Sequence, residues 1–97
     1  MVKFTHMRKI DHELESIPGV GKSIAQDLRN IGIWSVAKLR GKDPEKLYAK
    51  SNKFAGVVQD RCLLYVFRCA VYYAEDGRSL EKLKWWNWKD SPRKAGG

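Results

Sequence analysis

Apolar residues recur at helical spacing on either side of a short turn near the start of the chain. One stripe runs from Ile10 to Ile17 and a second from Ile24 to Ile31, with apolar positions three or four residues apart in each. The spacing predicts one helix over residues 9–16 and another over residues 22–31. A turn at residues 17–21, here called the glycine turn, joins them.

Capping residues mark the helices that follow. Ser35 can cap a short third helix, which we expect to run through Val36 and Leu39 and to end at Gly41. Asp43-Pro44 marks the start of a fourth, because aspartate caps helix starts and proline suits the first helical position. We expect this helix to end near Lys50, with a loop over residues 51–59.

The longest apolar stretch, residues 62–74, contains one charged residue, Arg68. Periodicity alone does not separate a buried helix from a buried strand here. The length, the few β-branched residues, the acid before the stretch and the glycine after it favour a helix at the centre of the domain. Ser79 is placed to cap one further turn, which leads into the tryptophan-rich residues 85–88.

A chain of 97 residues is long enough for one domain with a modest core. We predict an all-α domain of five to six helices over residues 9–89, with a loosely ordered lead-in over residues 1–8 and a flexible tail over residues 90–97. No apolar run is long enough to span a bilayer, and the N-terminus lacks the apolar core of a signal peptide. We therefore expect a cytoplasmic protein with no membrane partner.

The net charge of +8 is concentrated in two regions. Residues 22–42 hold five basic residues and one acidic residue, a net of +4, and residues 80–97 add +3. The excess begins directly after the glycine turn, which favours a polyanionic partner there. Lysine and arginine also solubilise small domains, so the charge alone decides little.

The glycine turn, Pro18-Gly19-Val20-Gly21, carries few side chains. Glycine lets the backbone approach a partner closely, and the N–H groups that begin the next helix lack intrahelical acceptors, which suits an anion such as phosphate. Gly21-Lys22-Ser23 also matches the end of a P-loop. However, Ser16 stands where that motif needs glycine, and a polar helix precedes the turn instead of a strand, which argues against nucleotide hydrolysis.

The pattern from Leu14 to Leu28 resembles the helix-hairpin-helix motif, in which backbone amides of the hairpin contact a DNA phosphate without reading sequence. The resemblance implies amide donors at Gly19, Gly21, Ser23 and Ile24. The hairpin and the charge together predict these nucleic-acid-binding residues: Pro18, Gly19, Val20, Gly21, Lys22, Ser23, Ile24, Arg29, Lys38, Arg40 and Lys42.

Some helix-hairpin-helix proteins also hold a monovalent cation on hairpin carbonyls. The matching positions are Glu15, Ile17 and Val20, so the resemblance allows a K⁺ or Na⁺ ion there, and we expect no other metal or cofactor. Residues 36–50 look like a second, degenerate copy of the hairpin, because their connection Arg40-Gly41-Lys42 lacks the second glycine.

Over residues 14–89 the chain resembles the small bacterial "pathogenicity locus" family of helix-hairpin-helix proteins. The stretches that carry the resemblance are Pro44-Glu-Lys-Leu-Tyr48, the apolar run Cys62 to Tyr73 and Leu83-Lys-Trp-Trp-Asn-Trp-Lys89. The resemblance implies a compact all-helical domain of the SAM-like kind and a bacterial origin. It implies less about function.

Other reactive and aromatic residues have simpler interpretations. Cys62 and Cys69 lie seven residues apart with no metal-type partner, so both are predicted to be reduced and buried. At least two of the three tryptophans in residues 85–88 are expected to cover the core, although aromatic rings beside lysines also suit stacking on single strands. His6 and His12 have no paired nucleophile, so we predict no enzyme activity.

These observations favour sequence-independent binding of DNA through the amides of the glycine turn. A single hairpin binds weakly, so a homodimer or a protein partner is expected to complete the site. The alternative is a protein–protein interaction module whose hairpin does not bind DNA.

Overall fold

The computed structural model describes residues 13–89, and these residues form helices and connecting turns without strands. The elements are η1 (Leu14–Ser16), α2 (Lys22–Asn30), η2 (Val36–Leu39), α3 (Pro44–Ala55), α4 (Arg61–Ala74) and η3 (Trp85–Trp88), where η denotes a 3₁₀ helix. The predicted all-α class is therefore confirmed. The predictions for the lead-in, for His6 and His12 and for the tail concern residues outside this range.

Most of the helices begin where the sequence predicts. Asp43 accepts a hydrogen bond from the Glu45 N–H (2.9 Å) at the start of α3, and Asp60 accepts one from the Cys62 N–H (2.9 Å) at the start of α4. The hydrogen bond from Cys62 stabilises the charged form of Asp60 and so lowers its pKa. The helix expected over residues 9–16 is present in the described range as η1 only.

The fourth predicted helix is longer than expected. α3 continues to Ala55, and Gly56 ends it in the left-handed conformation with φ of 78°. Ser51 and Asn52 are therefore helical, not part of a loop. Tertiary contacts explain the difference, because Gln59 donates hydrogen bonds to the Ser51 hydroxyl (3.0 Å) and to the Asn52 side-chain oxygen (2.9 and 3.0 Å).

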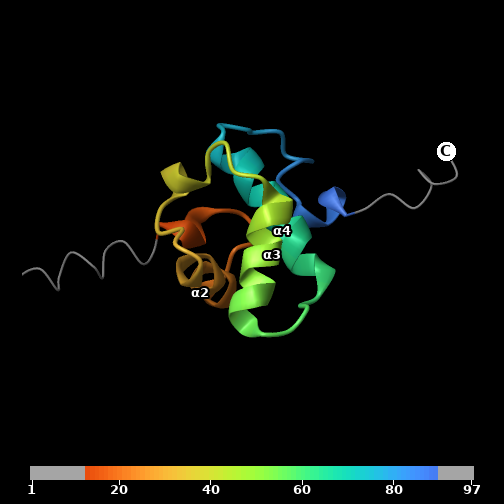
Figure 1. Cartoon of the computed structure of the whole chain (residues 1–97). Helices are drawn as coiled ribbons and strands as arrows, with labels where there is room; N and C mark the ends of the chain where they lie inside the picture. Colours follow the sequence, from red (N-terminus) through yellow and green to blue (C-terminus); the bar gives the residue numbers. More distant parts are fainter. Residues whose placement is uncertain (1–12, 90–97) are drawn as a thin grey trace, which may run out of the picture.

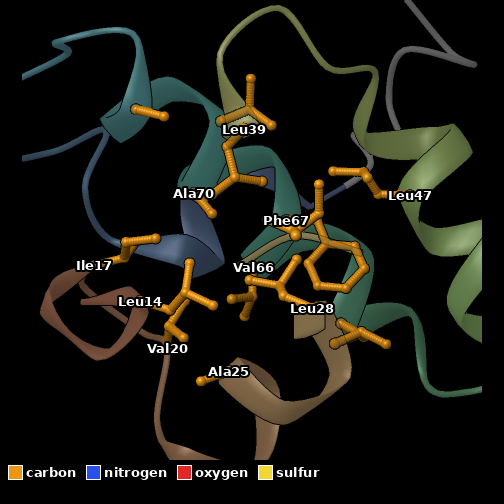
Figure 2. Packing of buried hydrophobic residues seen from close by; sticks show 14 of the residues in the cluster. Leu14, Ile17, Val20, Ala25, Leu28, Leu39, Leu47, Val66, Phe67 and Ala70 are labelled. Atoms are coloured by element: carbon orange, nitrogen blue, oxygen red, sulfur yellow. The ribbon is translucent and has the colours of Figure 1, made fainter. Parts of the chain in front are cut away.

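α4 is the central helix, as predicted, and it packs against α3, η2 and η3. Figure 1 shows α3 and α4 crossing in the middle of the molecule, with α2 beside them. The side chain of Phe67 on α4 is fully buried. Figure 2 shows that Leu14 of η1, Val20 of the glycine turn and Leu28 of α2 lie around α4. No helix among residues 13–89 is both long and apolar enough to cross a membrane.

The segment after α4 folds back over this core. Trp85 packs against the core cluster, and the ring of Trp88 lies against Tyr72 at a centroid distance of 5.5 Å. Arg68 of α4 links this segment to α3. It donates a hydrogen bond to the Trp88 carbonyl (2.6 Å) and forms an ion pair with Glu45 of α3 (2.8 Å). Trp85 thus packs on the core as predicted, Trp88 is partly buried against Tyr72, and Trp86 is half exposed.

Candidate nucleic-acid interface

The glycine turn is held in place by its one central side chain. Val20 is buried and its N–H donates to the Ile17 carbonyl (3.0 Å), which closes the turn. Gly19 has φ of 89°, a conformation that costs other residues free energy. A Cβ on Gly19 would also lie 2.9 Å from Cδ1 of Trp85. The fold itself therefore requires this glycine.

Gly21 differs from Gly19 in both respects. Its φ of −97° and ψ of −169° are accessible to any residue, and a Cβ built on it would have nothing within 4 Å. Neither backbone strain nor packing within the described residues requires glycine here. Because Gly21 has no side chain, the backbone at the start of α2 is open to a partner.

The start of α2 is the one α-helix start in residues 13–89 without a side-chain cap or an acid in its first turn. Its first hydrogen bond runs from the Ala25 N–H to the Gly21 carbonyl (2.9 Å), so the N–H groups of Lys22, Ser23 and Ile24 have no acceptor within the helix. Lys22 and Ser23 are exposed. These amides and the Lys22 ammonium form a compact group of donors suited to an oxyanion.

The second turn, residues 40–42, is arranged differently. The Gly41 N–H donates to a carboxylate oxygen of Glu75 (2.7 Å), and the Arg40 guanidinium forms an ion pair with Asp76 (2.8 Å). Glu75 and Asp76, at the exposed end of α4, thus bind the second turn. A carboxylate of the chain itself therefore occupies the Gly41 amide of the second turn.

The predicted basic residues lie in two groups. Lys22 stands at the glycine turn, and Arg29 lies in the last turn of α2, about 10 Å further along the axis. The Arg29 guanidinium is 6.0 Å from the ring centroid of Trp34, which is half exposed. Lys38 in η2 and Lys42 beside the second turn are exposed. The structure therefore brings Lys22 together with the amides of the glycine turn and places the basic residues at 38, 40 and 42 around the second turn.

The carbonyl groups suggested for a monovalent cation lie in and just before the glycine turn. One of them, that of Ile17, already accepts the Val20 N–H. No cluster of three or more His, Cys, Asp or Glu side chains suited to a metal ion occurs within residues 13–89. A K⁺ or Na⁺ ion on Glu15, Ile17 and Val20 stays a prediction of the resemblance.

A hollow of about 430 Å³ lies beside the glycine turn, between α2 and the start of α4. We call it the α2–α4 hollow; its lining includes Gly19, Ile24, Asp27, Cys62 and Trp85. The one sequence signal for this hollow is Asp27, an acid three residues after Ile24 on the apolar side of α2.

Cys62 is exposed at the rim of this hollow, so the prediction that both cysteines are buried is wrong for Cys62 and confirmed for Cys69. A hydrogen bond to Asp60 raises the pKa of the Cys62 thiol. The thiol is therefore neutral at physiological pH and a poor nucleophile.

The carboxylate of Asp27 makes no hydrogen bond or ion pair with any residue of the described range, and partial burial raises the pKa of Asp27. The native state therefore holds a proton on Asp27 at pH values where the unfolded chain has lost it, so stability falls as pH rises through that window.

We expect Asp27→Asn to be more stable than the parent protein at pH 7, and the difference in the free energy of unfolding to shrink towards zero near pH 3. Urea unfolding of both proteins at the two pH values measures this. A stability loss at pH 7 would contradict it.

Comparison with known proteins places this fold in a family. Residues 7–95 match the family model described as Cdd1, pathogenicity locus. The chain is also 36% identical over 76 residues to the "Mitomycin resistance protein McrB" of Streptomyces lavendulae, an alignment that covers 78% of this chain and 70% of that protein. No solved structure matches significantly. A match over nearly the whole chain agrees with the resemblance seen in its sequence, and the protein belongs to the pathogenicity locus family.

Proposed function

We propose that this protein binds DNA without sequence preference, through the uncapped amides at the start of α2. The observation that carries the proposal is Gly21, a glycine that neither strain nor packing requires and that leaves those amides open. Phosphate is the ligand that such amides and an adjacent lysine suit best. The contact involves no base edge, so all sequences are bound alike.

The arrangement around this site supports a helix-hairpin-helix of the SAM-like kind. The stripe of Leu14 and Ile17 packs into the same core as Ala25 and Leu28, with the glycine turn between them. The second turn is the degenerate copy, closed by Glu75. In this proposal one functional hairpin contacts one phosphate, and nearby lysines attract its neighbours.

Salt-titrated binding tests the proposal. We expect a labelled duplex to bind with an affinity that falls as salt rises, with a log–log slope of roughly −2 to −4 for two to four neutralised phosphates. Lys22→Glu should weaken binding and reduce the magnitude of that slope by about 1, because one phosphate contact is lost. Fluorescence anisotropy with two duplexes of unrelated sequence measures affinity and sequence preference together.

The matched control is Lys53→Glu, which makes the same charge change at an exposed lysine of α3 outside the candidate interface. It should alter binding less than Lys22→Glu does. Equal effects of the two substitutions would mean that net charge, not the glycine turn, governs the interaction. No binding at low salt would rule the proposal out.

A protein–protein interaction module is the second candidate, and one observation favours it. Phe54, Val57 and Val58, at the end of α3 and in the loop after it, are 63%, 62% and 83% exposed. Apolar side chains exposed this close together in sequence are typical of a contact surface. The two functions can coexist, because a protein partner on this surface would leave the glycine turn open.

The name of the Streptomyces lavendulae relative states a resistance phenotype and no ligand. The proposal therefore rests on the amides and charge of this chain.

A further inference from the structure

We infer that the α2–α4 hollow binds a small organic ammonium ion with an aromatic body. The hollow, at about 430 Å³, lies within the range of small-ligand sites. It goes beyond the proposed DNA contact, because the side chains of Asp27 and Trp85 would hold this ligand, whereas backbone amides would hold the phosphate; Gly19 and Ile24 lie beside both. The two sites can therefore be tested separately.

The acidic lining of the hollow favours a cationic ligand. The chain as a whole carries +8, yet among residues 13–89 the lining of the hollow includes the acidic residues Asp27 and Asp60 and no basic residue. One oxygen of Asp60 accepts the Cys62 N–H, whereas Asp27 has no partner in the described range. Asp27 is thus a partly desolvated carboxylate without a counter-charge. An ammonium group would supply the missing charge and a charge-assisted hydrogen bond.

The other residues that line the hollow favour an aromatic group in the ligand. Ile24 contributes from α2, Leu63 and Val66 from α4, and Trp85 from η3. The indole of Trp85 is fixed by its packing on Gly19, so this wall is formed before any ligand arrives. A flat apolar ring can stack on the indole, and an adjacent cation gains from its π-face.

Titration with tryptamine, followed by ¹H–¹⁵N correlation spectra, tests the inference. Tryptamine has an indole ring and an ammonium group; tryptophol has the same ring with a neutral hydroxyl in place of the ammonium. We expect tryptamine to shift the backbone signals of Gly19, Ile24 and Leu63 and the indole signal of Trp85. Tryptophol should bind roughly tenfold more weakly, because the ion pair is missing.

Asp27→Asn should lower the tryptamine affinity to about that of tryptophol, while its spectrum shows that the fold is intact. Glu81→Gln is the matched control, an exposed acid outside the hollow, and should leave tryptamine binding unchanged. Equal binding to the parent protein and to Asp27→Asn would overturn the inference. So would shifts confined to residues outside the hollow, or no saturable shift at all. None of these results depends on DNA binding.

Discussion

Replacing Gly19 by alanine should lower the free energy of unfolding by about 2 to 4 kcal/mol. About 1 kcal/mol of this comes from placing a Cβ at φ of 89°. The rest is steric, because that Cβ would lie 2.9 Å from Cδ1 of Trp85, and overpacking a tight contact costs about 1 to 3 kcal/mol. The indole cannot yield cheaply, since its Cβ and Cγ are close to the same point. Urea unfolding of the two proteins measures the loss.

Gly32 provides the matched control for this prediction. Its φ of 91° is almost the same, and a Cβ there would have nothing within 4 Å. Gly32→Ala should therefore cost only the backbone share, about 1 kcal/mol. In a double-mutant cycle with Trp85→Ala, the steric share of Gly19→Ala should disappear. If Gly19→Ala costs no more than Gly32→Ala, the Trp85 contact does not stabilise the turn.

The local signals in the sequence predicted most of the helix starts and the central helix. Asp43 and Asp60 are caps whose effect depends only on the next two residues, so sequence reveals them directly. The end of α3 was not predictable in the same way. Ser51 is a weak helix former by itself, and its place in the helix depends on Gln59, which returns eight residues later to bond to it.

The candidate site likewise has one part that the sequence predicts and one part that it does not. The start of α2 was predictable, because glycine, a short apolar stripe and a following lysine are all local. The closure of the second turn was not, since Gly41 and Glu75 are 34 residues apart and their pairing depends on how α4 packs. The sequence showed only that the second turn lacks the second glycine, whereas the structure shows that its Gly41 N–H donates to the Glu75 carboxylate.

Replacing Gly21 by aspartate should change stability and DNA binding in opposite directions. The backbone at Gly21 accepts a side chain without strain, and the space around it is open. Aspartate at this position can accept a hydrogen bond from the uncapped amides of α2, as Asp43 and Asp60 do for α3 and α4. It also places a negative charge at the positive end of the helix dipole. We expect the free energy of unfolding to rise by a few tenths of a kcal/mol, or by up to about 1 kcal/mol.

The same carboxylate should abolish the phosphate contact, because it occupies the amides and repels the backbone of DNA. Loss of charge-assisted hydrogen bonds worth about 1.5 to 3 kcal/mol predicts at least a tenfold fall in affinity at low salt.

Gly21→Ala separates the effect of the added charge from that of the added bulk, since a methyl group hinders the approach of phosphate without capping the helix or adding charge. Its affinity should lie between that of the parent protein and that of Gly21→Asp. Thermal unfolding and anisotropy on the same three proteins measure both quantities. A Gly21→Asp protein that is more stable and still binds DNA as the parent does would show that the uncapped start of α2 is not the DNA contact, and would leave the exposed surface around Phe54 as the stronger candidate.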